Sequence, residues 1–101
     1  MNPLVNEVVQ KIAEAIQPTR IILFGSQVYG GVSPGSDIDL AIVYSGPRPK
    51  RELKVEIHKL FEHPNFSMDL FVFTPEELES QKHIANTLAR EISEKGLVCY
   101  G

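Results

Sequence analysis

A chain of 101 residues has the length of one small domain, and we predict a single domain over residues 1–101. A hydrophobic fraction of 43 % and a charged fraction of 23 % are typical of a soluble globular protein, while a formal net charge of −3 argues against a dedicated nucleic-acid binder. The single cysteine, Cys99, cannot form an internal disulfide, and no apolar run approaches the ~18 residues of a membrane span. We therefore expect a cytoplasmic protein with a modest core and a shallow binding cleft.

The first half of the chain predicts one helix and two strands. Apolar residues recur at helical spacing over residues 4–16, which indicates an amphipathic helix. The continuous apolar run of residues 20–24 is typical of a strand buried on both faces, and it stops at Gly25 and Ser26. After a polar, glycine-rich stretch, residues 37–43 (Asp-Ile-Asp-Leu-Ala-Ile-Val) predict a second strand.

The next segment predicts a helix, a strand and the start of another helix. Residues 51–63 carry their apolar side chains on one side, as a helix would, and residues 68–73 form a third apolar strand pattern. Thr74 and Glu77 have the spacing of a capping box, in which each side chain bonds the other residue's backbone N–H. We therefore expect a helix to begin directly after Thr74.

The end of the chain predicts a last helix and a short strand. The helix is expected over about residues 82–95, with Ile84 and Ile92 facing inward. Gly96 is expected to end it in a left-handed conformation, and residues 97–100 are expected to add a final strand. The resulting order, α-β-β-α-β-α-α-β, predicts an α+β (mixed α/β) fold with a small mixed β-sheet flanked by helices.

Two carboxylates are expected on one face of the second strand. Side chains alternate across a strand, so Asp37 and Asp39 point to one face while Ile38 and Leu40 point to the other. The two aspartate Cα atoms then lie roughly 6.5–7 Å apart, close enough for both carboxylates to share bound cations. Paired acids on a sheet face are unfavourable unless they are solvated, paired or metal-bound, and this strand contains no lysine or arginine to pair them.

The connections between the strands predict that a third aspartate joins the pair. The segment from Phe24 to Asp37 has no helical pattern, which favours antiparallel pairing and makes Gly25 and Ser26 neighbours of Asp37 and Asp39. The next connection is long and contains a helix, which favours a parallel, right-handed unit. Asp69 lies near the start of its strand, as Asp39 does, so parallel pairing brings both to the same edge of the sheet.

This set of groups suits phosphoryl chemistry. Magnesium prefers hard oxygen ligands and is typically held by one or two carboxylates together with substrate phosphates. Two such ions can activate an attacking oxygen and stabilise a leaving one. Gly25 lets the backbone approach a phosphate closely, and the Ser26 hydroxyl can donate to a phosphate oxygen.

These residues resemble the signature of the DNA polymerase beta-like nucleotidyltransferases. The signature consists of Gly25 and Ser26, ten intervening residues, the Asp37–Asp39 pair, and Asp69 on a later strand. The length and layout are most similar to the minimal nucleotidyltransferases (MNT). A pair of aspartates alone is a weak signal, whereas the whole set at strand ends is specific.

The resemblance implies a role for each of these residues. Asp37 and Asp39 would bind two catalytic Mg²⁺ ions, and Asp69 would hold the acceptor-side ion and help to deprotonate the attacking hydroxyl. Gly25 and Ser26 would contact the triphosphate. ATP is the expected nucleotide.

The resemblance also implies a biological partner. Proteins of the MNT type are typically antitoxins paired with a helical HEPN-domain toxin, which they silence by attaching AMP to a tyrosine. The expected activity is therefore that of a protein adenylyltransferase, with no direct binding of nucleic acid.

The chain departs from the family pattern at two positions, which supports an alternative function. Gln27 and Tyr29 stand where many family members carry arginine. Losing two cations near a triphosphate weakens binding, since a hydrogen bond to a charged group contributes about 1.5–3 kcal/mol. The alternative is a catalytically weak or inactive binding module that neutralises a partner by occlusion. A glycosyltransferase that uses paired aspartates fits poorly, because it would need a larger sugar-nucleotide domain.

Overall fold

The computed structural model describes residues 3–25, 37–61 and 67–101. Its elements follow in the order α1 (Pro3–Ile16), β1 (Arg20–Phe24), β2 (Asp37–Val43), α2 (Lys50–Leu60), β3 (Ser67–Phe73), α3 (Pro75–Gln81), α4 (Leu88–Lys95) and β4 (Leu97–Tyr100). This order and the mixed α+β class are those predicted from the sequence. Among the described residues, no helix combines the length and apolar composition that a membrane span requires.

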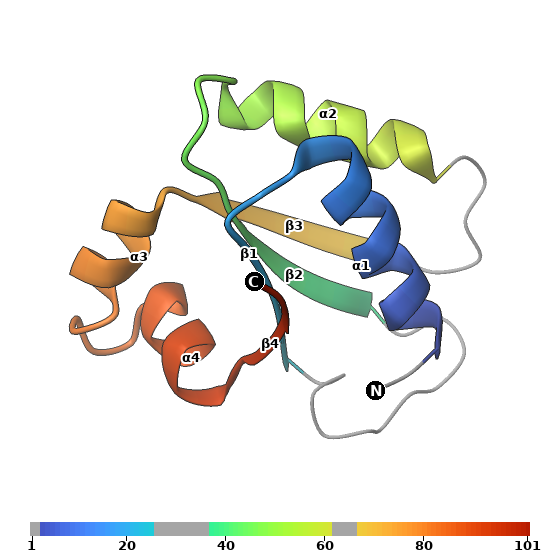
Figure 1. Ribbon diagram of the computed structural model, residues 1–101. Helices are drawn as coiled ribbons and strands as arrows, with labels where there is room; N and C mark the ends of the chain where they lie inside the picture. The colour runs from blue at the N-terminus through green and yellow to red at the C-terminus, as the bar shows by residue number, and fades with distance from the viewer. Residues whose placement is uncertain (1–2, 26–36, 62–66) are drawn as a thin grey trace.

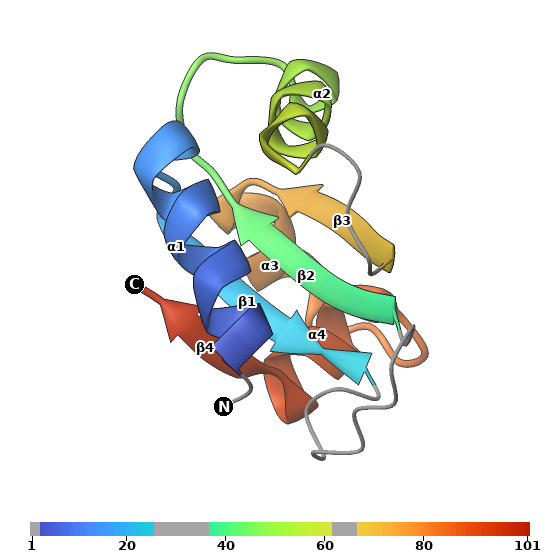
Figure 2. The ribbon, with the colours of Figure 1, turned by 90° about the vertical axis from the view of Figure 1, so that its right-hand side faces the viewer.

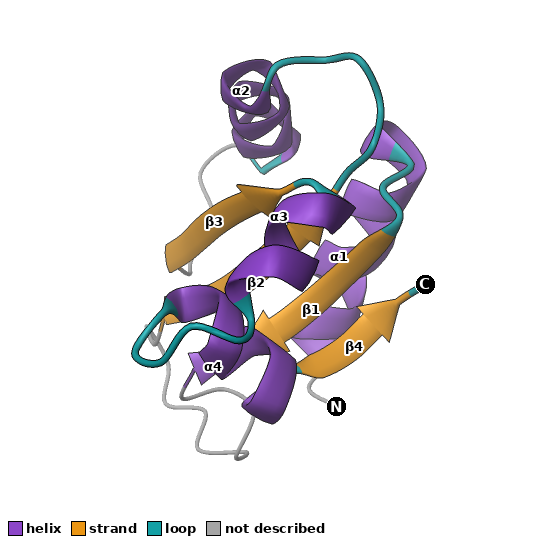
Figure 3. Ribbon diagram, turned by 90° about the vertical axis from the view of Figure 1, so that its left-hand side faces the viewer, coloured by secondary structure: helices purple, strands orange, loops and turns teal. Residues whose placement is uncertain are grey.

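The four strands form one mixed sheet in the order β3-β2-β1-β4. β1 runs antiparallel to both β2 and β4, while β2 and β3 are parallel. Both pairing directions predicted around the aspartates are therefore confirmed. The helices lie on the two faces of this sheet, with α1 on one side (Figure 2) and α3 and α4 on the other (Figure 3).

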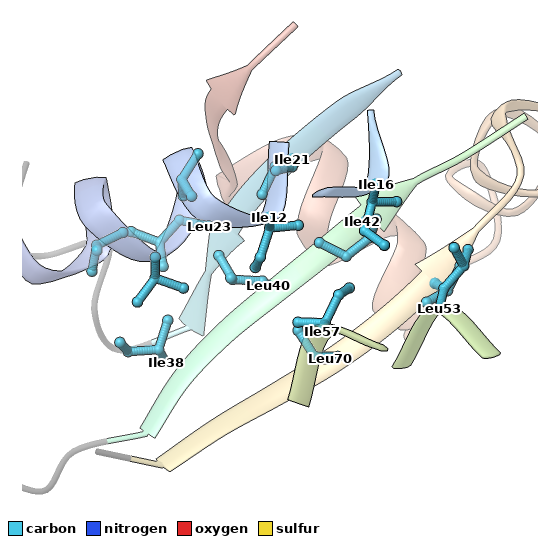
Figure 4. Close-up of a cluster of buried hydrophobic side chains, with 14 residues drawn as sticks. Ile12, Ile16, Ile21, Leu23, Ile38, Leu40, Ile42, Leu53, Ile57 and Leu70 are labelled. Carbon is cyan, nitrogen blue, oxygen red and sulfur yellow. The ribbon is translucent and has the colours of Figure 1, made fainter. Parts of the chain in front are cut away.

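The larger part of the core fills the space between the sheet and helices α1 and α2. Figure 4 shows that side chains from α1, β1, β2, α2 and β3 meet there. The largest of the deeply buried side chains are Ile12, Ile21, Leu23, Ile38, Leu40, Ile42, Leu53 and Ile57. The predicted alternation along β2 is confirmed, because Ile38, Leu40 and Ile42 all face this side.

A smaller core lies on the opposite face, under α3 and α4. It contains Ile22, Phe24, Ala41, Val43, Leu78, Ala89 and Ile92. Each inner strand is therefore buried on both faces, as the continuous apolar run in β1 predicted.

The capping box at the start of α3 is confirmed. The Thr74 N–H donates to Glu77 Oε1 at 2.8 Å, and the Glu77 N–H donates to Thr74 Oγ1 at 3.0 Å. Lys50, at the start of α2, donates to the same carboxylate, with its Nζ 2.6 Å from Oε1 and 2.7 Å from Oε2. Glu77 thus joins the starts of α2 and α3 (Figure 1).

Two predicted helix boundaries are wrong. α2 ends at Leu60, because the Phe61 N–H bonds the His58 carbonyl and the Phe61 backbone leaves helical geometry. The predicted last turn falls on residues 62 and 63, which lie outside the described residues. α4 starts at Leu88 and not near residue 82, because the Thr87 hydroxyl accepts the Arg90 N–H at 3.2 Å and caps the helix there.

Two details near α4 also differ from the prediction. Ile84 precedes the helix and is 56 % exposed, so its predicted inward position is wrong. Gly96 has φ −74° and ψ 154°, an extended and not a left-handed conformation. Glycine is needed there for space, since a Cβ would overlap the Ile92 carbonyl oxygen and the Ile22 side chain.

We predict that Glu77→Gln destabilises the protein at neutral pH and that this effect disappears in acid, once the pH is below the folded-state pKa of Glu77. Hydrogen bonds from Lys50 and from the Thr74 backbone hold the pKa of Glu77 below its usual 4.5. The ionised carboxylate therefore contributes stability above about pH 4.5, and this contribution is lost as the pH falls through the folded-state pKa. Urea unfolding at pH 7 should show a loss of about 0.2–1 kcal/mol, the range for an exposed pair.

The matched control is Glu76→Gln, in the same first turn of α3 but without a partner in Thr74 or Lys50. This variant makes the same change in charge near the helix start. Its loss of unfolding free energy at pH 7 should be smaller than that of Glu77→Gln. Equal losses in the two variants would contradict the role given to the Lys50–Glu77 pair.

Candidate functional site

The polar ends of three strands meet at one end of the sheet. β1 runs toward this end, and β2 and β3 both start from it (Figure 2). This arrangement follows from the antiparallel pairing of β1 with β2 and the parallel pairing of β2 with β3. The same end carries the described members of the predicted site.

Asp39 and Asp69 are register partners on adjacent parallel strands. Partners in a parallel pair project to the same face, and neighbouring strands lie about 4.8 Å apart. Asp39 is half-buried and Asp69 is exposed. The structure therefore brings these two predicted site residues side by side, with Asp69 on the outer strand.

Gly25 lies against Asp39, as predicted. Gly25 follows β1 directly and has φ +80°, in the left-handed region that favours glycine. A Cβ at this position would overlap Asp39 Oδ2 and lie 3.4 Å from Asp39 Cγ. The absent side chain thus leaves room for the Asp39 carboxylate beside the backbone.

Two members of the predicted site are described only in part or not at all. Asp37 starts β2 and pairs in register with Ser67, so its backbone lies two residues before Asp39 on the same strand. The side chain of Asp37 and the whole of Ser26 lie outside the described part of the chain. Gln27 and Tyr29 also fall outside it.

An apolar floor lies behind the two acids. The sequence analysis did not identify this floor. Phe24 is the register partner of Asp39 on β1 and is buried. Its ring packs edge-to-face on Phe71, with ring centroids 5.5 Å apart and an interplanar angle of 61°. The signal was present in the sequence: Phe71 lies two residues after Asp69, on the same strand face.

This environment suits a bound cation. Two carboxylates on neighbouring strands repel each other unless a positive charge lies between or beside them. Among the described residues, none forms a hydrogen bond or ion pair with the Asp69 side chain.

The donor set fits a hard divalent ion. Aspartate oxygens are the ligands that Mg²⁺ takes in proteins, usually one or two carboxylates completed by water and phosphate oxygens. Within the described side chains, no group of three or more potential metal ligands occurs. The predicted metal ligands are Asp37, Asp39 and Asp69, and the side chain of Asp37 is not among the described ones. The chain contains no other aspartate.

Comparisons with known proteins identify the same kind of domain. The family model for the nucleotidyltransferase domain matches residues 5–98. The chain is similar to a solved structure titled "Crystal structure of the toxin-antitoxin with AMP-PNP", with a TM-score of 0.67 and 21 % sequence identity. The likeness covers 95 % of this chain and 73 % of that one, and at this identity it shows the fold alone. None of the curated proteins matches the sequence.

We predict that Gly25→Ala destabilises the fold by about 1–3 kcal/mol, the usual magnitude for strained backbone. Alanine would have to hold a left-handed conformation while its Cβ overlaps Asp39 Oδ2. The free energy of unfolding, measured in urea, checks this. Gly46→Ala is the control: its φ is not positive, and the added methyl meets only the outer end of the Tyr44 side chain. A Gly46→Ala loss as large as that of Gly25→Ala would contradict the assignment.

Proposed function

The chain belongs to the nucleotidyltransferase domain family, and we propose that it transfers AMP from ATP to a hydroxyl group of a partner protein, with Mg²⁺ as cofactor. The observation that carries this proposal is the register pairing of Asp39 with Asp69 next to the close approach of Gly25. In the biological setting we propose, the chain is an antitoxin and the hydroxyl belongs to a tyrosine of a HEPN-type toxin.

Asp37, Asp39 and Asp69 are the residues that would hold the magnesium ions. The bound ions would neutralise charge on the triphosphate and lower the pKa of the attacking hydroxyl. The carboxylate chemistry, the exposed position of Asp69 and the space left by Gly25 all support this assignment.

The remaining residues bind and orient the reactants. Gly25 and Ser26 contact the triphosphate, because the first allows a close backbone approach and the second offers a hydroxyl donor. Asp69 accepts the proton of the acceptor hydroxyl while the oxygen of that hydroxyl attacks the α-phosphorus of ATP. The bond between the α-phosphorus and the bridging oxygen breaks, and pyrophosphate leaves with the bond electrons.

A protein acceptor is supported by the openness of the site. Asp69 is exposed on β3, the outer strand of the sheet, so an acceptor approaching from solvent can reach it. The structural neighbour is, by its title, a toxin–antitoxin with AMP-PNP, an analogue of ATP. The HEPN partner and its tyrosine rest on the resemblance to MNT proteins.

We predict that Asp39→Asn and Asp69→Asn each lower adenylyl transfer at least about 100-fold, equal to about 2.7 kcal/mol of transition-state stabilisation. Each change removes a negative charge that the reaction requires without changing the size of the side chain. The measurement is the transfer of label from α-³²P-ATP, with Mg²⁺, to a helical partner protein encoded beside this chain.

Glu79→Gln is the control, because it also neutralises one carboxylate but lies exposed on α3. It should label the partner at the wild-type rate. Labelling that persists in both aspartate variants would reject the proposed chemistry.

Binding of ATP separates the proposed enzyme from the alternative of pure occlusion. We predict that Mg²⁺ with ATP at 100 times the Kd raises the Tm of the wild type by at least about 10 °C, since such binding adds about 2.7 kcal/mol. The Asp39→Asn/Asp69→Asn double variant should show only a small shift. A wild type that neutralises its partner with no Tm shift in ATP would favour occlusion, which Gln27 and Tyr29 in place of arginine would explain.

A further inference from the structure

β4 forms an apolar, exposed edge of the sheet. It is the end strand of the order β3-β2-β1-β4, and no described strand pairs with its outer side. Figures 2 and 3 show this side of β4 open, from both faces of the sheet. The side chains of Leu97, Val98 and Tyr100 are 44 %, 50 % and 39 % exposed.

Such an edge is normally protected. An outer strand presents a row of backbone N–H and C=O groups to any other strand, and proteins usually block it with charges or proline, or by making the strand short or bulged. β4 reads Leu-Val-Cys-Tyr, so it is short but contains no charge and no proline. Its one irregularity is a bulge at Cys99, where Ile21 pairs with Tyr100 and Ile22 with Val98.

A groove lies beside the bulged part of the strand. Cys99 and Tyr100 line this groove together with residues of α1. Its wall includes the amides Asn6 and Gln10 and the carboxylate Glu14, all on α1, together with Gln17, which directly follows the helix. The exposed edge is therefore flanked by a mostly uncharged polar helix face.

We propose that β4 pairs antiparallel with β4 of a second copy of this chain. The two four-stranded sheets would join into one continuous sheet across a two-fold axis. We call the surface made by β4 and the α1 face that lines the groove the edge surface.

The composition of the edge surface favours a second copy as its occupant. A two-fold interface places each patch against itself, so a charged patch would oppose its own charge. β4 has no charge, and the groove contains one carboxylate, Glu14. Amide side chains both donate and accept hydrogen bonds, so they complement their own copies. The ion pair of α1, Glu7 with Lys11, is not part of the groove.

The size of the edge surface requires both of its parts. A four-residue strand is only about 13 Å long, whereas a specific interface buries about 800 Å² on each partner. The strand alone is too small for such an interface, so the groove and the facing part of α1 must also take part. Asp39 and Asp69 of the candidate site lie on β2 and β3, and β1 separates these two strands from β4. The proposal is therefore independent of the proposed function.

Sedimentation velocity from 1 to 300 μM tests the pairing. The wild type should dimerise within this range, and Val98→Lys should raise the dimer dissociation constant at least tenfold, because two added charges would face each other. Val55→Lys is the matched control: Val55 lies on α2, is 48 % exposed against 50 % for Val98, and should dimerise like the wild type. A monomeric wild type at 300 μM overturns the proposal, even if another protein binds the edge. So does a Val98→Lys variant that dimerises normally, or equal weakening by Val55→Lys.

A crosslinking experiment tests the location without adding charge. In a Cys99→Ser background, which removes the only thiol, a new cysteine is placed at Val98 or at Val55. A short bismaleimide should link Val98→Cys chains into dimers at least ten times faster than Val55→Cys chains. Equal rates in the two variants overturn the proposal, and far-ultraviolet circular dichroism shows that both are folded.

Discussion

Neighbouring residues of β2 face opposite sides of the sheet, and both the core and the candidate site depend on this alternation. Leu40 is fully buried under α1 and α2, while Asp39 lies on the other face, near the start of the strand. The same strand that anchors the core thus holds the carboxylate. Because β2 is paired on both sides, the position of Asp39 is fixed by two sets of backbone hydrogen bonds.

Most of the fold was predictable because its signals are local. The strands around the aspartates are short apolar runs bounded by turn residues. The capping box of Thr74 and Glu77 indicates the start of α3. The start of α4 was missed because residues 82–95 keep a helical apolar spacing, while the Thr87 cap stops the helix from extending backward. Gly96 was misread because its role is tertiary: it gives room to Ile22, a contact that no local pattern reveals.

The candidate site was predictable only as a topology. Connection lengths indicated that Gly25, Asp39 and Asp69 would meet, and the described structure agrees for these three. The sequence did not predict which residues pair across neighbouring strands. The length of a connection restricts the possible registers of two strands but does not select one of them. The Phe24–Phe71 floor follows from that register, which is why it emerged only with the coordinates.

The parallel pairing of β2 with β3 has a consequence for the accuracy of folding. A shift of β3 by one residue would turn Asp69 toward the apolar space under α1 and α2 and bring the normally buried Leu70 and Val72 to the opposite face. A misaligned site is therefore also a poorly packed protein. Selection for a well-packed core is enough to keep Asp39 and Asp69 in register, without any contact dedicated to that purpose.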